Sequence, residues 1–324
     1  MTNRIVSGIQ PTGRMHLGNW MGAVSNWVSL QSTHQPVLFV ANLHALTGAP
    51  QLAEDMRYTT RQLVYDLLSC GIDPNRSILF CQSDVPAHSE LHLILSMVTP
   101  IPWLERVPSY KDKRDALGEE WNHYGFLGYP VLQAADILLY HPTGVPVGKD
   151  QLPHLELTRE IARRFNHRYG PILCEPVDMV TETPVLPGLD GRKMSKSYQN
   201  TIPITATQSE VETLVKRMVT DPNRVRKTDC GTPEQCPVFA YHQQFSTPEA
   251  CQDVAHACRT ASIGCVACKT QCAAALNRYL HPIRERAHTV TNQTIDEVLA
   301  AGRIQANQLA SYTMDKVKQV IGFS

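Results

Sequence analysis

Two short segments of this chain carry residues that could grip a nucleotide. The segment GRKMSKS places two lysines and two hydroxyls within five residues, 193–197, directly after a stretch rich in proline and glycine. A lysine ammonium is a compact charge with three donors on a flexible stem, which suits it to follow a departing pyrophosphate. Alone, the segment would be an exposed basic turn. Together with HLGN at residues 16–19, it predicts a site that binds ATP and transfers an adenylyl group.

The HLGN segment lies where an open parallel sheet would bind a ligand. Residues 4–9 are predicted to form a first strand, followed by a loop containing Gly13 and a helix that begins at Leu17 or Gly18. Ligands of such sheets bind at the carboxyl ends of the strands, and a helix N-terminus offers free N–H groups to phosphates. The chain contains neither GxGxxG nor GxxxxGK[ST], so the dinucleotide fingerprint and the Walker loop do not apply.

The pattern of apolar residues predicts an α/β fold with a Rossmann-type parallel sheet. Residues 36–42 and 77–82 are near-continuous apolar runs, typical of strands buried on both faces, and 145–147 is a shorter strand. Segments with helical periodicity alternate with these strands, which favours crossover helices. They are residues 52–69, 88–98, 133–140 and 151–169.

The pattern changes near residue 200, where we expect a domain boundary. Four later segments are helical, and no buried-strand run follows them: residues 206–219, 247–260, 267–287 and 293–320. The prediction is a catalytic domain over residues 1–200 and an all-helical domain over 201–324, whose last helix could pack back on the first domain.

The composition limits the partners of the chain. The chain has 324 residues and a formal net charge of zero, so it exerts no long-range electrostatic attraction on nucleic acid, and we expect no DNA partner. An RNA must be held by local basic patches, although these could equally be solvated surfaces. Without an apolar run of about 18 residues or a signal peptide, we expect a cytoplasmic protein that does not cross a membrane. The candidate basic residues are Arg217, Arg224, Arg226, Lys227, Arg278, Arg284 and Arg286.

Four of the ten cysteines have a spacing that predicts a metal site. Cys236, Cys258, Cys265 and Cys268 follow C-x21-C-x6-C-x2-C, and a C-x2-C pair in a reducing compartment argues for metal ligation. Zinc and an iron–sulfur cluster both use four thiolates, so the spacing leaves Zn²⁺ and iron–sulfur open. The third interpretation is that these cysteines are buried thiols that bind no metal.

Several motifs resemble those of class I aminoacyl-tRNA synthetases. GIQPTGRMHLGN is similar to the first signature of that class, and GRKMSKS is similar to the second. The lead-in GIQPTG, with YPVLQAADILLY, VPVGKDQ and HLELTREIARRFN, resembles the bacterial-type tryptophanyl-tRNA synthetases across essentially the whole chain. The resemblance implies that L-tryptophan attacks ATP to give tryptophanyl-adenylate and pyrophosphate. The cognate tRNA(Trp) then takes the tryptophanyl group.

The resemblance also implies roles for individual residues. Catalytic roles fall to His16, Asn19, Lys111, Lys113, Lys193 and Lys196. Contacts with ATP fall to Gln10, Pro11, Thr12, Gly18, Asn19, Gly148, Lys149, Asp150, Val185, Lys193, Met194, Ser195, Lys196 and Ser197. Mg²⁺ is expected because the leaving group is pyrophosphate.

Asp136 is the expected partner of the substrate indole. The indole N–H is only a donor and a carboxylate is only an acceptor, so the pair is complementary and excludes phenylalanine. It does not by itself exclude tyrosine. Gln133 stands where some relatives have methionine, and a purely structural role for His44 stays open. The residues expected at the amino acid are Ser7, Gln10, His44, Gln133, Asp136 and Gln151.

Some members of this family carry a 4Fe-4S cluster in the C-terminal domain, and CPVFAYHQQF with CRTASIGCVAC resembles that subgroup. The resemblance implies that the four cysteines hold such a cluster near the surface that reads the anticodon, with Zn²⁺ as the alternative. The first gap is one residue shorter here, so Cys230 is the substitute for Cys236. Tyr241, His242 and Arg259 are expected to contact bases.

The family further implies a homodimer in which each tRNA spans both subunits. Three other readings compete with a tryptophan–tRNA ligase. They are the tyrosine-specific relative, a paralogue that binds tryptophan or tRNA without charging, and a redox sensor that uses the cysteines.

Overall fold

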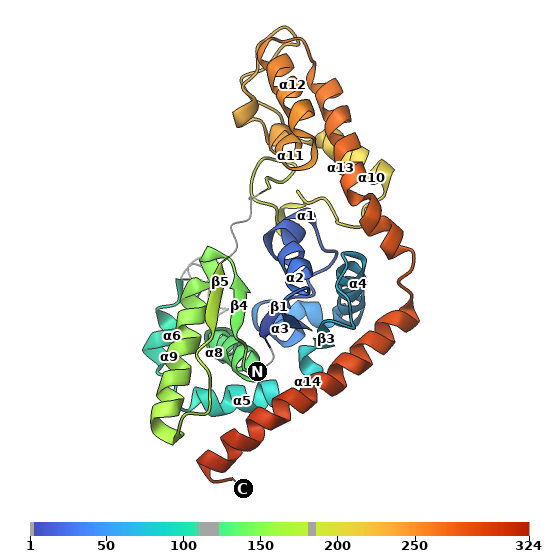
Figure 1. The fold of residues 1–324 in the computed structure, drawn as a ribbon. Helices are drawn as coiled ribbons and strands as arrows, with labels where there is room; N and C mark the ends of the chain where they lie inside the picture. Colours follow the sequence, from blue (N-terminus) through green and yellow to red (C-terminus); the bar gives the residue numbers. More distant parts are fainter. Residues whose placement is uncertain (1–2, 109, 111–122, 181–185, 324) are drawn as a thin grey trace.

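The computed structural model describes residues 3–108, 110, 123–180 and 186–323 (Figure 1). Its centre is a five-stranded sheet in the order β3-β2-β1-β4-β5, in which every neighbouring pair is parallel. The strands are β1 (Arg4–Ile9), β2 (Gln35–Val40), β3 (Ile78–Cys81), β4 (Gly144–Val147) and β5 (Val177–Val180). The strand order reverses between β1 and β4, where such sheets open a crevice for ligands. The predicted α/β class with a Rossmann-type sheet is confirmed.

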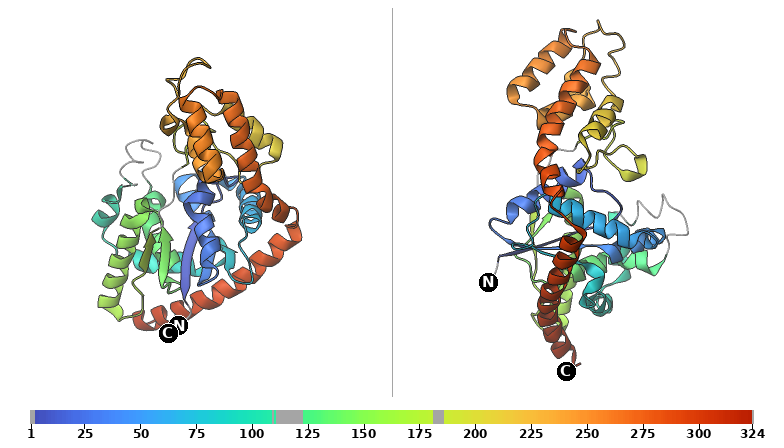
Figure 2. Two further views of the ribbon diagram at one scale, coloured as in Figure 1. Left: turned by 45° about the horizontal axis from the view of Figure 1, so that its top comes forward. Right: turned by 90° about the vertical axis from the view of Figure 1, so that its right-hand side faces the viewer.

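Helices lie on both faces of this sheet (Figures 1 and 2). Those of the first part are α1 (Leu17–Asn19), α2 (Ser25–Leu30), α3 (Asn42–Gly48), α4 (Met56–Ser69), α5 (Ala87–Ser96), α6 (Ile101–Glu105), α8 (Tyr124–Leu138) and α9 (Leu152–Tyr169). A π-helical turn, Trp20–Val24, joins α1 to α2. Those of the later part are α10 (Gln208–Arg217), α11 (Pro237–Phe245), α12 (Pro248–Arg259), α13 (Cys265–Ala287) and α14 (Asn292–Ile321).

The side chains of β2 alternate between two hydrophobic cores. Leu38 and Val40 pack with residues of α2, α4 and α13, whereas Val37 and Phe39 pack with residues of α5, α8 and α9. Successive residues of a strand point to opposite faces, so a strand covered on both sides must be apolar throughout. The apolar run over residues 36–42 predicted this strand for that reason.

Helices α10 to α13 gather at one end of the sheet (Figure 1). Val211, Val238 and Leu276 of these helices share a core with Met15 and Leu17, which flank His16. The helical region therefore shares its core with the residues that flank His16.

Helix α14 runs back along the sheet next to β3 (Figures 1 and 2). A Cβ at Gly302 would lie 1.9 Å from the carbonyl oxygen of Leu79, so only glycine permits this approach. Farther along the helix, Thr313 donates its hydroxyl to the carbonyl of Leu139 at 2.6 Å. In the described part of the chain, no helix has the length and apolarity that a bilayer crossing requires.

Several boundaries differ from those predicted. Helix α8 begins at Tyr124 instead of residue 133, because Pro130 lies inside the helix and obscures its first turns. Helix α11 was not predicted, although Pro237 at its first position is a typical helix start. Strand β5 was also missed, since its short segment alternates only weakly and its outer residues are exposed.

Candidate active site

His16 caps α1 directly after the loop that leaves β1. The backbone N–H of Asn19 donates to His16 Nδ1 at 3.3 Å, and the N–H of His16 donates to Asn19 Oδ1 at 3.2 Å. This reciprocal pair assigns the ring proton to Nε2. Burial, followed by the charge of Lys196, lowers the pKa of His16 to about 4. At neutral pH His16 is therefore an uncharged donor that can approach a phosphate oxygen.

The second signature segment lies against the first. Lys196 Nζ donates to Thr12 Oγ1 at 3.1 Å and to the carbonyl of Gly13 at 2.9 Å. Burial lowers the pKa of Lys196 to about 8, with the carboxyl of Asp66 acting in the opposite direction. Two segments 183 residues apart thus form one positively charged edge.

Asn200 holds the turn of the second segment. Its Oδ1 accepts the N–H of Ser195 at 2.8 Å, and its Nδ2 donates to Asp190 Oδ1 at 2.7 Å and to the carbonyl of Lys193 at 3.2 Å. The side chain is only 2 % exposed. Lys193 itself is exposed, whereas Met194 is buried. Sequence reasoning missed Asn200 because nothing in its neighbourhood marks it as buried.

Asp66, which sequence reasoning also missed, is a clasp between the first segment and the chain that follows the second. It is completely buried, and its two oxygens accept the N–H of Met15 at 2.8 Å and the hydroxyl of Thr205 at 3.0 Å. Backbone bonds reinforce the join, from Leu17 to Ile202 and from Ile204 to Met15. Burial raises the pKa of Asp66, and the hydrogen bonds oppose this rise. The clasp fixes the residues on both sides of His16.

Asp136 occupies the end of α8 with three buried donors around it. His88 Nδ1 lies 2.6 Å and Gln82 Nε2 lies 2.7 Å from Oδ1, and His44 Nε2 lies 2.7 Å from Oδ2. His88 also contacts the hydroxyl of Tyr140 at 2.7 Å. Burial alone would raise the pKa of Asp136, but the two histidines outweigh it and hold the pKa well below its usual range. The carboxylate is ionised, and Oδ2 has a lone pair left for another donor.

Gln82 and His88 are further site residues that sequence reasoning missed, although the polar QSDVPAH run after a buried strand was a usable signal. The remaining expected residues follow neighbouring strands. Ser7 and Gln10 lie at the end of β1, and His44 lies in the first turn of α3 after β2. Gly148, Lys149, Asp150 and Gln151 follow β4, where Gln151 donates to Asp150 at 3.0 Å. Because the carboxyl ends of parallel strands share one edge, these groups face one crevice.

Four of the expected contacts fall outside what the structure describes. Lys111, Lys113 and Val185 lie outside the described residues, as does the side chain of Ser197.

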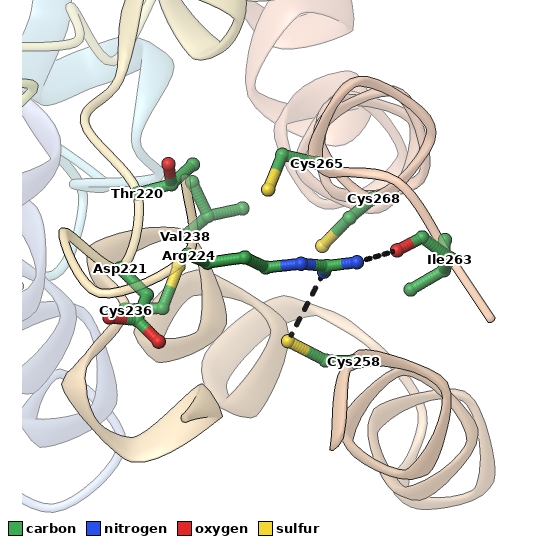
Figure 3. Close-up of a pocket in the computed structure, with 9 residues that line it drawn as sticks. All are labelled: Thr220, Asp221, Arg224, Cys236, Val238, Cys258, Ile263, Cys265 and Cys268. Atoms are coloured by element: carbon green, nitrogen blue, oxygen red, sulfur yellow. Dashed lines mark hydrogen bonds between the residues drawn. The ribbon is translucent and has the colours of Figure 1, made fainter. Parts of the chain in front are cut away.

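The four cysteines of the C-x21-C-x6-C-x2-C pattern line one pocket (Figure 3). Cys236 lies in it and Cys230 does not. Burial, followed by its three neighbouring cysteines, raises the pKa of Cys268 to about 12. Within the described residues, no three His, Cys, Asp or Glu side chains are arranged closely enough to hold a metal ion.

Arg224 runs between these cysteines (Figure 3). Its Nη1 lies 3.7 Å from Cys258 Sγ, and its Nη2 donates to the carbonyls of Ile263 at 2.6 Å and Lys227 at 3.1 Å. Its Nε is buried without a hydrogen-bond partner, and no carboxylate pairs with it in the described part of the chain. Arg224 is only 8 % exposed, so its prediction as part of an RNA-binding surface patch was wrong.

Two of the residues expected to contact bases are also buried. Tyr241 is fully buried and donates its hydroxyl to the carbonyl of Pro187 at 2.8 Å. His242 is 1 % exposed and pairs with Ser246 Oγ at 2.8 Å. Neither ring can stack on a base, so both predictions were wrong. Arg259 is exposed, with Glu234 as its partner.

A Rossmann-type parallel sheet with these two signature segments at its carboxyl edge defines the class I aminoacyl-tRNA synthetases. Residues 2–281 match the family described as tRNA synthetases class I (W and Y), and the chain belongs to that family. It is 46 % identical to the tryptophan–tRNA ligase of Thermotoga maritima, over 98 % of each chain, and 40 % identical to that of Aquifex aeolicus, over 98 % of this chain and 99 % of the other.

Solved structures agree with this assignment. The tryptophanyl-tRNA synthetase of Campylobacter jejuni complexed with ADP and tryptophan is 35 % identical, with a TM-score of 0.89 over 98 % of this chain and 99 % of that one. The tyrosyl-tRNA synthetase of Archaeoglobus fulgidus, at 21 % identity and a TM-score of 0.66, shares the fold.

Proposed function

We propose that the chain ligates L-tryptophan to tRNA(Trp) in two steps. The tryptophan carboxylate attacks the α-phosphate of ATP and the bond to pyrophosphate breaks. A ribose hydroxyl of the tRNA then attacks the acyl carbon of the tryptophanyl-adenylate, the acyl–phosphate bond breaks, and AMP leaves. Full-length similarity to curated tryptophan–tRNA ligases supports the overall reaction. The observation that carries the activation step is the contact of Lys196 with Thr12 and Gly13, which joins the two signature segments.

Activation depends mainly on positioning and electrostatics. Two anions must meet, and negative charge grows on the departing pyrophosphate. His16 can donate from Nε2, and Lys196 supplies a cation that its fixed hydrogen bonds already orient. Lys193 is exposed on the same turn and can swing toward the phosphates. Mg²⁺ would neutralise phosphate oxygens when it enters with ATP.

Asp136 is proposed to accept the indole N–H. His44, His88 and Gln82 keep this carboxylate ionised and fixed in direction, so a substrate without a donor leaves it with an unsatisfied position. Gln133 is half-buried one turn earlier on α8 and is proposed to contact the amino-acid end together with Ser7, Gln10 and Gln151.

For the cysteine pocket we propose the 4Fe-4S cluster, held by Cys236, Cys258, Cys265 and Cys268, with Zn²⁺ as the alternative. Three observations support this proposal. Four soft sulfur donors line one pocket, and the buried Arg224 cation has no carboxylate partner in the described residues. In addition, a Cβ at Gly231 would lie 2.6 Å from Cys258 Sγ, so glycine leaves that thiol its room. When bound, the group would cross-link the loop before α11 to α12 and α13.

We further propose a catalytic domain over residues 1–200, an anticodon-binding domain over 201–324, and a cytoplasmic homodimer. Exposed apolar side chains on the neighbouring helices α5, α6 and α8 support a subunit interface. They are Leu93, Met97, Ile101 and Tyr124.

The test of the activation step is ATP–pyrophosphate exchange with tryptophan, tyrosine or phenylalanine supplied separately. We expect exchange with tryptophan alone, followed by charging of tRNA(Trp). Exchange with tyrosine would transfer the assignment to the tyrosine-specific relative, and tRNA binding without exchange would favour a non-charging paralogue. Iron, sulfide and zinc analysis of anaerobically purified protein decides between the two metal groups. A Cys265→Ser variant that folds and charges like the parent would argue against any role of the cluster.

A further inference from the structure

A basic groove lies between α10 and α13, two helices that pack side by side (Figure 1), and it shares no lining residue with the cysteine pocket. Its volume is about 590 Å³. Glu212 is the single carboxylate that lines it, and four permanent cations face this carboxylate: Lys216, Lys269, Arg278 and Arg284. In a chain whose formal net charge is zero, this is a local concentration of positive charge.

Two of the four cations are held in fixed positions by neutral groups. Lys269 Nζ donates to the carbonyls of Lys216 at 3.0 Å and Met218 at 2.6 Å, so it caps the C-terminal end of α10. Arg284 donates to the carbonyl of Ala206 at 2.7 Å and to Asn277 Oδ1 at 2.6 Å. These contacts orient the charges without neutralising them.

The other two cations, Lys216 and Arg278, are exposed at the sides of the groove. Neither side chain has a hydrogen bond or an ion pair within the ranges that the structure describes. Lys269, Arg278 and Arg284 all line the groove from α13, and the 15 steps from the first to the last correspond to about 22 Å of helix. The cations therefore form a row that matches a polyanion better than a single phosphate.

We propose that this groove binds the phosphodiester backbone of RNA, namely the tRNA that the proposed function makes a co-substrate; the inference rests on that function. The apolar lining consists of Ala273 and Ala274, without an aromatic ring. A protein partner would lack an anchor, since protein interfaces concentrate their energy in buried aromatic and arginine contacts. The lining offers bases the imidazole of His281 but no Phe, Tyr or Trp ring, so the groove contacts mainly phosphates, with Thr270 as an additional donor, and it positions the RNA without reading its sequence.

The experiment measures tRNA(Trp) affinity against KCl concentration for the parent, for the Lys216→Ala/Arg278→Ala double variant, and for a control, Arg217→Ala. Arg217 is exposed on the same helix but does not line the groove. Each phosphate contact contributes about 0.7 to 0.9 to the slope of log K against log salt. We expect the double variant to lose about 1.5 in slope and at least fivefold in affinity at low salt, whereas tryptophan-dependent pyrophosphate exchange is unchanged.

Three results would overturn the inference. The first is a double variant with the parent slope and affinity, and the second is a loss no larger than that of Arg217→Ala. The third is binding of poly-glutamate at the groove while the salt dependence of tRNA binding stays unchanged. This result would assign the groove to an acidic protein. In all three cases unimpaired exchange and charging leave the proposed function standing. A parent protein that neither exchanges pyrophosphate nor binds tRNA would refute both.

Discussion

The pKa of Lys196 should set the alkaline limit of the activation step. The ammonium is oriented by Thr12 and Gly13, and burial lowers its pKa from the usual 10.5 to about 8. Only the charged form can stabilise the departing pyrophosphate. Because a lowered lysine pKa means that the charge is lost at lower pH, kcat/KM for ATP should fall as the pH rises through about 8.

The size of the effect follows from the fraction of Lys196 that stays protonated. With a pKa of about 8, this fraction is about one tenth at pH 9 and about one hundredth at pH 10. A lysine with the usual pKa of 10.5 would remain almost fully charged at pH 9. The structure thus predicts a decline of nearly tenfold per pH unit above 8, starting about 2.5 units lower than for an exposed lysine.

The assay is tryptophan-dependent ATP–pyrophosphate exchange at subsaturating ATP between pH 6 and pH 10. In Lys196→Arg the guanidinium remains charged throughout this range, so the decline near pH 8 should disappear even if the absolute rate is lower. Lys216→Arg, which alters an exposed lysine far from the crevice, should keep the parent profile. A parent that retains full kcat/KM to pH 9.5, or a Lys196→Arg variant with the same midpoint, would refute the assignment.

Three further substitutions test the other features of the two sites. Asp66→Asn weakens a hydrogen bond to a charged acceptor, and since such bonds contribute about 1.5–3 kcal/mol, kcat/KM for ATP should fall about 10- to 100-fold; parent kinetics would disprove the clasp. Asp136→Asn should raise the KM for tryptophan at least tenfold with little change in the KM for ATP, as measured by exchange kinetics. An equal effect on both KM values would contradict the assignment of Asp136 to the indole. Gly231→Ala would place a methyl group 2.6 Å from Cys258 Sγ, so metal content per chain should fall by more than half, whereas Gly264→Ala, with no contact closer than 3.8 Å, should keep it.

The sequence predicted those parts of the site that depend on local pattern. A strand that ends at a glycine-containing loop before HLGN must place His16 at the carboxyl edge of the sheet, and apolar runs identified β2 and β3 because both faces of these strands are covered. It could not predict Asp66 or Asn200. Asp66 accepts from the N–H of Met15 and from the hydroxyl of Thr205, which lies 139 residues away, and Asn200 bonds groups of a non-repetitive turn. Such pairings leave no periodic signal.

The errors around the cysteines have a different physical cause. Tyr241 and His242 were expected to contact bases because they lie near the cysteines, and Arg224 was assigned to a surface patch because it lies in the basic run from Arg217 to Lys227. Helix α11, however, places Tyr241 and His242 on its buried face, and the loop before it folds Arg224 inward. Residue type indicated the chemistry that these groups can perform, but only the packing of α11 against α13 decided which side they face.

Lys196 and Arg224 share one electrostatic feature. Each is a buried or half-buried cation without a carboxylate ion pair in the part of the chain that the structure describes. Such a charge costs stability unless an anion accompanies it. At Lys196 the anion is the substrate phosphate, so ATP should stabilise the fold as well as bind to it. At Arg224 the deprotonated cysteines of the proposed metal site would supply the negative charge, so metal content and the stability of this region should fall together.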